Sequence, residues 1–229
     1  MRIFHIFHSG FLVRIENKVL VFDCLDKTIS KEFTKEDKVY VFISHSHSDH
    51  YSKDVFEWEN INSNIKYFLG DDIKLNNKKS NYYLMGRYKS QDTDDLQIQS
   101  FGSTDSGVSF LVTIDNMKIF HAGDLNWWHW KNDSKKAQRR EEEDFKAEVK
   151  RLQDESIDVA FIPVDPRLEE YYHIAAEYFV KTISPKILVP MHFGNEFAIT
   201  DKIKDKLSPY NVEVLRIERK NQELDIRLK

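Results

Sequence analysis

The stretch Val39-Tyr40-Val41-Phe42-Ile43-Ser44-His45-Ser46-His47-Ser48-Asp49-His50 joins an apolar run to a dense group of metal-binding side chains. The run over residues 39–43 is β-branched and aromatic with no polar break, which is typical of a strand buried on both faces. Three imidazoles and a carboxylate follow where that strand should end. The stretch therefore predicts a buried strand that delivers metal ligands at its carboxyl end.

The spacing of these ligands suggests two neighbouring ions. Alternate residues of an extended chain share a face, so His45 and His47 can point at one ion. If the chain then turns, Asp49 and His50 face a second ion. Two divalent ions about 3.5–4 Å apart can hold a bridging hydroxide ready for hydrolysis. A solvated, His-rich turn is the alternative, but His-x-His-x-Asp-His is far more specific than a lone pair of histidines.

Length and composition favour one globular domain. The chain has 229 residues, of which 41% are hydrophobic and 31% charged, and no repeat or Gly/Ser-rich linker divides it. We therefore expect a single domain over residues 1–229. The net charge of −4 provides no field that would steer a polyanion, so a small-molecule substrate is expected rather than a nucleic acid. The sequence leaves the oligomeric state open.

The sequence also favours the cytoplasm. Cys24 is the only cysteine, so an intramolecular disulfide is excluded and a free core thiol is expected. The N-terminus lacks the apolar region of a signal peptide, and no stretch approaches the roughly 20 apolar residues that span a bilayer. We expect a cytoplasmic protein without a membrane partner.

Periodicity and turn signals predict an α/β chain. Helices are expected over 51–59, within the highly charged segment 131–155, and over 171–183 and 200–207. A disordered insert is the alternative for 131–155, but Phe145, Val149 and Leu152 form an apolar stripe at helical spacing. Strands are expected over 2–7, 11–16, 19–23, 39–43, 65–69, 82–84, 96–101, 108–114, 117–121, 157–164, 187–189, 212–217 and 224–228.

Two further loops after predicted strands carry ligand-type residues. Asp124 ends Ile119-Phe120-His121-Ala122-Gly123-Asp124, a strand that runs into a glycine able to form a sharp turn. His192 follows the predicted strand at 187–189. Alone, each residue would more often have a structural role. Because ligands in α/β sheets collect beyond the carboxyl ends of strands, the three strand ends together predict one shared metal site.

These motifs, in this order, resemble the metallo-β-lactamase superfamily: His45-Ser-His47-Ser-Asp49-His50, then Gly123-Asp124, then Pro190-Met191-His192. The likeness covers nearly the whole chain. The short length of the chain is similar to that of the compact branch of the superfamily, which includes ascorbate-6-phosphate lactonase-like proteins. The resemblance implies an αβ/βα sandwich, with two mixed β-sheets packed face to face and helices on the outside.

The resemblance also assigns roles to the motif residues. It implies that His45 and His47 bind the first metal ion, and that Asp124 bridges the two ions. The second ion would be bound by Asp49, His50 and His192. A bridging hydroxide would be the nucleophile, and Asp49 could also shuttle a proton to the leaving group. Asp49 and Asp124 are therefore the expected catalytic residues.

One position departs from the family pattern. The family usually supplies another histidine to the first metal ion, yet residues 86–120 contain none. Asp105 is the best replacement ligand, although a slip of one residue would put Thr104 or Ser103 there, and Asp105 could simply cap the turn. Zinc is the expected metal for both ions. An aspartate ligand moves the balance toward manganese or iron, which remain alternatives.

Four more residues are candidate substrate contacts. His8 lies in a turn near the expected metal edge, where a buried structural role is the alternative. Trp127 and His129 follow Asp124 and could line a pocket, although aromatic clusters are more often core. Arg167 could hold a substrate anion, with a surface salt bridge as the alternative. His121 is expected to support the Asp124 loop.

The expected function is a metal-dependent hydrolase acting on a small-molecule ester, lactone, amide or phosphoester. A phosphodiesterase or nuclease is the second hypothesis, and it needs a basic surface that the sequence cannot locate. A non-hydrolytic metal-binding protein is the third, prompted by the missing histidine.

Overall fold

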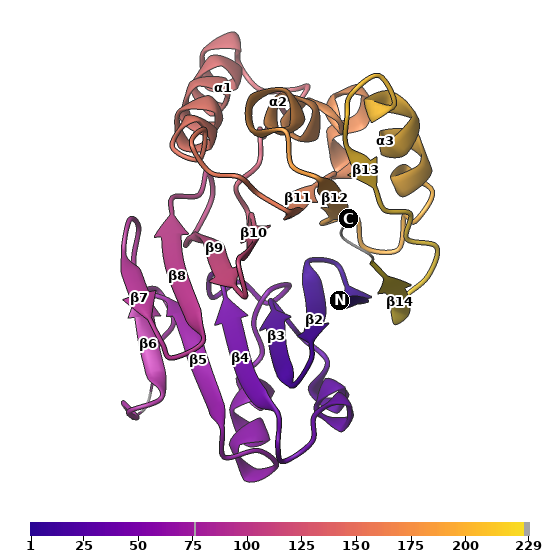
Figure 1. The fold of residues 1–229 in the computed structure, drawn as a ribbon. Helices are drawn as coiled ribbons and strands as arrows, with labels where there is room; N and C mark the ends of the chain where they lie inside the picture. The colour runs from indigo at the N-terminus through magenta and orange to yellow at the C-terminus, as the bar shows by residue number, and fades with distance from the viewer. Residues whose placement is uncertain (76, 227–229) are drawn as a thin grey trace. The chain divides into compact units, whose positions relative to one another are not determined.

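The computed structural model describes residues 1–75 and 77–226, and Figure 1 shows its helices and strands. The chain divides into two compact units: Met1–Met85 with Arg219–Lys229, called unit 1 here, and Gly86–Glu218, called unit 2. Each unit has its own seven-stranded sheet. None of the helices in the described residues has the length and apolar character to cross a membrane.

The sheet of unit 1 is mixed. Its strand order is β14-β1-β2-β3-β4-β5-β6; β3 to β6 run parallel, and the pairs on the β14 side are antiparallel. Two 3₁₀ helices, η1 (Lys27–Glu32) and η2 (Lys53–Asn60), connect its parallel strands. The strands are β1 (Arg2–Phe7), β2 (Gly10–Ile15), β3 (Lys18–Phe22), β4 (Lys38–Ile43), β5 (Ile65–Gly70), β6 (Tyr82–Met85) and β14 (Gln222–Asp225).

Strand β4 is buried on both faces, as its sequence predicts. On one face Phe42 stacks between Phe22 of β3 and Phe68 of β5, with ring centroids 4.8 and 5.0 Å apart. On the other face Val39, Val41 and Ile43 join a second apolar cluster. Burial on both sides fixes the direction and register of β4, and therefore the place where the His-rich turn begins.

The sheet of unit 2 is mixed as well. Its order is β13-β12-β11-β10-β9-β8-β7, parallel from β10 to β13 and antiparallel from β7 to β10. Figure 1 shows α1, α2 and α3 along the same side of this sheet. The strands are β7 (Ser90–Asp92), β8 (Leu96–Phe101), β9 (Ser109–Ile114), β10 (Met117–His121), β11 (Val159–Pro163), β12 (Ile187–Met191) and β13 (Glu213–Val214), and the helices are α1 (Lys135–Lys150), η3 (Pro166–Tyr171), α2 (Ile174–Ile183) and α3 (Ile199–Leu207).

The charged segment 131–155 forms helix α1, as predicted. Ser134 caps the helix by accepting a hydrogen bond from Ala137 N–H. Phe145 and Val149 are buried along one face, and the buried Leu152 follows in the turn after the helix. The apolar stripe, rather than the charge, therefore decided the structure of this segment.

Most predicted elements are confirmed, and the differences lie at ends and edges. The helix expected over 51–59 is the 3₁₀ helix η2 (Lys53–Asn60), whose short apolar face places only Val55 and Trp58 in the core. The strand expected at 212–217 is reduced to Glu213–Val214. The strand expected at 224–228 is β14, while residues 227 and 228 lie outside the described range. β7 and η1 were not predicted.

The structure also shows a tight hairpin turn and the predicted core thiol. Asp115 and Asn116, between β9 and β10, both have positive φ (48° and 65°), as a type I′ turn requires. Cys24 is buried, and burial raises the pKa of its thiol to about 12. The side chain is therefore a neutral part of the core.

Candidate metal centre

The His-rich segment of unit 1 brings its imidazoles together. His47 accepts two backbone hydrogen bonds at its carbonyl, from His50 N–H (3.0 Å) and Tyr51 N–H (2.9 Å), so the chain turns as soon as β4 ends. The ring of His45 lies 4.5 Å from that of His47 and 4.3 Å from that of His50. Imidazoles this close can share one site or serve two adjacent ions.

Asp23 organises two of these histidines. Its buried carboxylate follows β3, the parallel neighbour of β4, and accepts three hydrogen bonds of 2.7 Å, from Ser44 N–H, Ser44 Oγ and His50 Nδ1. Because Ser44 gives its hydroxyl proton to Asp23, its Oγ can accept from His45 Nδ1 at 2.9 Å. Both imidazoles are thereby held with the proton on Nδ1 and the lone pair on Nε2, as metal ligation requires.

The backbone fixes this turn from the side of β5. A Cβ at Gly70 would lie 2.3 Å from the carbonyl oxygen of Ser44, so the end of β5 must carry glycine for the backbone after β4 to approach this closely. Asp72 then accepts a hydrogen bond from Ser46 N–H at 2.9 Å. The loop that presents His45 and His47 is therefore anchored between two neighbouring strands.

His8 and Asp49 form the exposed edge of this cluster. His8, at the turn between β1 and β2, places Nε2 3.6 Å from Asp49 Oδ2, and its ring lies 5.9 Å from that of His50. The ligand atoms of His8, Asp49 and His50 lie within 4.8 Å of one another, so the geometry also allows His8 as a ligand. Half of the Asp49 side chain is exposed to solvent, which suits a group that exchanges protons.

In unit 2, the structure brings Asp124 and His192 together. Both are buried, and His192 Nε2 lies 3.2 Å from Asp124 Oδ1. The other ring nitrogen of His192, Nδ1, donates to Asp165 Oδ2 at 3.1 Å. A lone pair on Nε2 therefore faces a carboxylate oxygen, an arrangement that requires a proton or a cation between the two atoms.

Arg167 holds Asp165 rather than standing apart as an anion clamp. Its guanidinium binds both carboxylate oxygens, with Nε 3.0 Å from Oδ1 and 2.9 Å from Oδ2. Burial alone would raise the pKa of Asp165, but hydrogen bonds from His192 and Arg167 outweigh it and lower the pKa to about 2. Asp165 is thus a fixed anion that orients His192, and the alternative of a structural ion pair fits Arg167 better than the predicted substrate contact.

The loop between β8 and β9 places Thr104, rather than Asp105, against the Asp124 loop. Thr104 Oγ1 lies 3.2 Å from Asp124 O and 2.6 Å from Asn126 O, and it accepts from Asn126 N–H. Asp105 is exposed and lines a hollow with Arg87 and Arg140. It belongs to neither His/Asp group found in residues 1–75 and 77–226. The hollow also contains the carboxylates of Asp144 and Glu148, and the role of Asp105 as the replacement ligand stays a prediction.

His121 supports the Asp124 loop, as expected. It is buried at the end of β10, and its Nδ1 accepts a hydrogen bond from Gly123 N–H at 3.2 Å. Gly123 has φ of 54°, which lets the chain turn directly before Asp124.

The aromatic run after Asp124 divides between helix packing and the site. Trp127 lies against Phe145 of α1 with centroids 6.2 Å apart, and Lys146 Nζ sits 4.6 Å above its ring, so it packs with the helix. His129 contacts the ring of Tyr171 at 4.3 Å. Trp128 is the member that faces a predicted ligand, with its ring 5.6 Å from that of His192 and the two ring planes at 71°.

Sequence reasoning missed the roles of Asp23, Asp165 and Trp128. A signal for the two acids exists: each directly follows or closely follows a buried strand whose parallel neighbour ends in a predicted ligand, β3 beside β4 and β11 beside β12. For Trp128 no such signal separates it from its aromatic neighbours.

The donor set fits divalent metal ions. Three of the predicted ligand histidines, His45, His50 and His192, have Nδ1 engaged by a hydroxyl or a carboxylate, which is the outer-shell arrangement typical of metal-binding imidazoles. Carboxylates of Asp49 and Asp124 lie beside histidines in their own units. Imidazole and carboxylate together suit zinc, manganese or iron.

Comparison with known proteins agrees with this description. Residues 2–141, more than half of the chain, match the β-lactamase superfamily domain. The chain is similar to Igni18, a metallo hydrolase from the archaeon Ignicoccus hospitalis KIN4/I, with 20% identity over 100% of this chain and 99% of that one and a TM-score of 0.71. It is also similar to CmlA, a diiron β-hydroxylase from Streptomyces venezuelae, with 9% identity over 98% of this chain and 54% of that one and a TM-score of 0.67.

A third similar structure is the short form of human tRNase Z, with 13% identity over 100% of both chains and a TM-score of 0.55. At these identities the likeness establishes the fold, not the activity. It confirms the expected αβ/βα fold class with two mixed sheets. The chain belongs to the metallo-β-lactamase superfamily.

Proposed function

We propose that the protein is a metal-dependent hydrolase that holds two divalent ions and cleaves a small-molecule ester, lactone, amide or phosphoester. One observation carries the proposal: His45, His50 and His192 each have Nδ1 engaged by a hydroxyl or a carboxylate, which prepares Nε2 for a metal ion. Histidines with a purely structural role do not require a fixed Nδ1 partner, yet three of the predicted ligands have one.

The ligands are proposed to be the residues of the motifs. His45 and His47 would hold the first ion, Asp124 would be shared, and the second ion would be held by Asp49, His50 and His192, with His8 as a further candidate in this group. Zinc is the proposed metal, with manganese or iron as alternatives for a site that includes carboxylates. When bound, such ions polarise a substrate carbonyl or phosphoryl oxygen and lower the pKa of water to about 7.

The chain's own residues would perform the remaining tasks. Asp49 is half exposed and lies 3.6 Å from His8 Nε2, so it can take a proton and pass it to a leaving group. Asp23 and Asp165 hold the imidazoles in one tautomer throughout the reaction. Trp128 covers one side of His192 and limits the access of water there.

A small-molecule substrate is supported by charge and by resemblance. The net charge of −4 does not favour a polyanion, and the motifs resemble the compact branch with ascorbate-6-phosphate lactonase-like proteins. We therefore propose lactones and phosphoesters as the first substrates to examine.

The decisive experiment combines metal analysis with a substrate panel. Purified protein should contain close to two ions per chain by mass spectrometry, and the loaded protein should hydrolyse a member of a panel of lactones, carboxylic esters and chromogenic phosphoesters. Asp124→Ala should lose metal and most of that activity. One ion or none in wild-type protein under metal-replete conditions, or full activity in Asp124→Ala, would refute the proposal.

The non-hydrolytic alternative has one specific observation in its favour. Residues 86–120 contain no histidine, and Thr104 rather than Asp105 lies against the Asp124 loop, so the first ion would lack the usual third imidazole. Redox chemistry at an iron-loaded centre would appear as oxygen consumption with a reductant. Hydrolysis by the zinc-loaded protein without oxygen consumption by the iron-loaded protein would decide for the hydrolase.

A further inference from the structure

Unit 1 contains a cavity whose lining includes none of the predicted metal ligands. It measures about 290 Å³ and lies between η2, the loop after β5 and strand β6 at the edge of the sheet. Its lining residues are Tyr51, Lys53, Phe56, Lys74, Leu75, Asn77, Lys79 and Tyr82. Water occupies about 30 Å³ per molecule in the liquid, so the cavity is large enough for an aromatic ring with a substituent.

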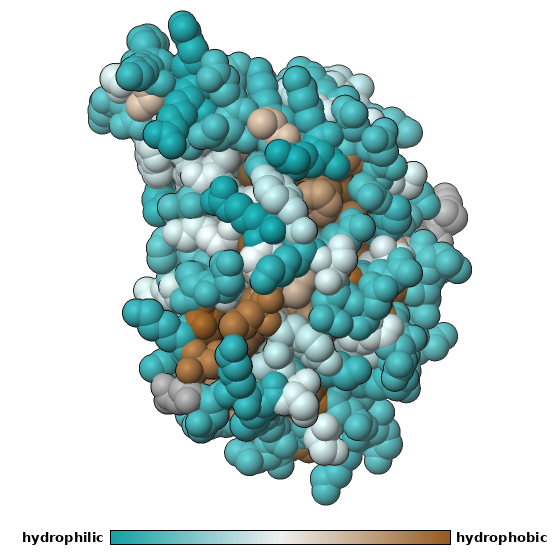
Figure 2. All heavy atoms as spheres, turned by 90° about the vertical axis from the view of Figure 1, so that its left-hand side faces the viewer, coloured by the Kyte–Doolittle hydropathy of each residue, from teal (hydrophilic) through white to brown (hydrophobic). Residues whose placement is uncertain are grey.

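The floor of the cavity is aromatic and apolar. Phe56 stacks on Tyr82 with centroids 5.1 Å apart, and Tyr51 meets Phe56 edge-on at 6.3 Å. Tyr51, Phe56, Leu75 and Tyr82 are only partly buried, although they pack against the core of unit 1. Figure 2 shows a patch of hydrophobic atoms surrounded by hydrophilic ones on the face toward which β6 lies in Figure 1. Partly exposed rings in a hollow are typical of a ligand pocket.

The rim of the cavity is cationic. Three lysines line it and no acidic side chain does. Lys79 is engaged by an ion pair with Glu59 and lies over the Tyr82 ring. Lys53 and Lys74 are exposed, and among the described residues neither has an ion pair. Two ammonium groups beside an apolar floor favour an anion that carries an apolar body.

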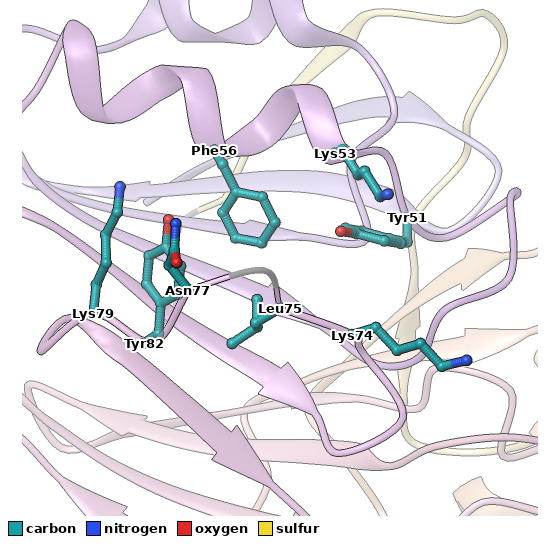
Figure 3. A pocket seen from close by; sticks show the side chains of 8 residues that line it. All are labelled: Tyr51, Lys53, Phe56, Lys74, Leu75, Asn77, Lys79 and Tyr82. Carbon is teal, nitrogen blue, oxygen red and sulfur yellow. The ribbon is translucent and has the colours of Figure 1, made fainter.

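A buried hydroxyl supplies the third feature. The Tyr51 Oη atom is buried, and it has no hydrogen-bond partner among the described residues. Figure 3 shows that this hydroxyl points toward the Phe56 ring, with the ammonium groups of Lys53 and Lys74 on the Tyr51 side of the view. A phenol hydroxyl can donate one hydrogen bond to an acceptor placed in the cavity. A buried donor in this position costs stability unless a ligand or water accepts its proton.

We propose that this cavity binds a small organic anion: a flat aromatic ring that carries a carboxylate or phosphate-type group. The ring lies on Phe56, Leu75 and Tyr82, while the anionic group takes the Tyr51 hydroxyl and the ammonium groups of Lys53 and Lys74. Tyr51 also donates its backbone N–H to His47 O at 2.9 Å, so the occupied cavity adjoins the His-rich turn. The site is independent of whether the protein proves to be a hydrolase.

Phenylphosphonate is the probe for this site, because its C–P bond resists hydrolysis. The full chain, treated with a chelator so that metal cannot bind the phosphonate, is titrated by calorimetry at low ionic strength. We expect saturable binding of one molecule per chain. Benzyl alcohol, which has the ring without the charge, and inorganic phosphate, which has the charge without the ring, should each bind at least tenfold more weakly.

Substitutions of the residues that line the cavity test where the probe binds. The double variant Lys53→Gln/Lys74→Gln should weaken phenylphosphonate binding at least tenfold, and Tyr51→Phe should weaken it several-fold. Leu75→Asn, in a half-exposed loop, should weaken it without a loss of folding by circular dichroism. Lys35→Gln, an exposed lysine of the same unit outside the cavity, should leave it unchanged. Absence of binding at millimolar probe, equal binding of phosphate and phenylphosphonate, or an unchanged affinity in the double lysine variant would overturn the proposal.

Discussion

Asp23→Asn removes one charge from the centre of the imidazole network and should weaken metal binding without changing any predicted ligand. The carboxylate accepts three hydrogen bonds of 2.7 Å in a buried position. An asparagine has one acceptor oxygen, so whichever way its amide is turned, the NH₂ group faces at least one of the donors on Ser44 or His50.

The magnitude follows from the bonds lost. Hydrogen bonds to a charged group contribute about 1.5–3 kcal/mol, and a buried donor left facing another donor costs about 1–3 kcal/mol. We expect the metal-free variant to lose about 3 kcal/mol of unfolding free energy. Loss of an outer-shell partner typically lowers metal affinity about 10–100-fold, and we expect that range here.

Competition with a zinc-binding chromophore measures the affinity, and guanidinium unfolding of chelator-treated protein measures the stability. Asp154→Asn, which alters an exposed carboxylate of unit 2, serves as the control and should change neither quantity. A zinc affinity for Asp23→Asn within twofold of wild type would refute the reasoning, because it would mean that the tautomers of His45 and His50 do not depend on Asp23.

Three further predictions concern separate parts of the chain. Asp165→Asn should lower zinc affinity about tenfold or more, because Asp165 contacts His192, whereas Arg167→Gln should change it little, because Arg167 contacts only Asp165 in this network. Equal losses in the same chromophore assay would contradict this assignment. Burial lowers the pKa of His5 to about 4 in the folded protein, so the unfolded chain takes up this proton at a higher pH, below about 6.5, than the folded chain does. The unfolding free energy should therefore drop by up to about 3 kcal/mol between pH 6.5 and 4. His5→Phe should flatten this slope in denaturant titrations. Phe145→Ala should destabilise the protein by about 3–5 kcal/mol in guanidinium unfolding, and a loss under 1 kcal/mol would argue against packing of α1 as described.

The fold was largely predictable because its strands differ sharply from their surroundings. Runs such as residues 39–43 are apolar without interruption, and the structure makes them central strands. Errors occurred where burial is slight: β7 lies at a sheet edge, β13 has only two residues, and η2 is a 3₁₀ helix with two buried side chains. In such segments local propensity is weak, and tertiary contacts decide the outcome.

The candidate site was predictable in its ligand types but not in their support. The sequence places His45, His47 and His50 at a strand end, and the structure brings their rings together. Asp105, Trp127 and Arg167 were each chosen for their chemistry and their position after a strand. The structure places Asp105 in a surface hollow, Trp127 against α1 and Arg167 against Asp165, and their roles as ligand or substrate contacts stay predictions.

The His-rich segment after β4 thus has two kinds of determinant. The sequence alone specified the buried strand, the turn and the metal-binding character, because these depend on residues adjacent in the chain. Only the tertiary structure decided that Asp23 would orient His50, that Asp165 would orient His192, and that Thr104 would take the place beside Asp124. These partners lie on neighbouring strands and loops 20 or more residues apart in the sequence, where pairing and register of the strands, rather than local pattern, determine which side chains meet.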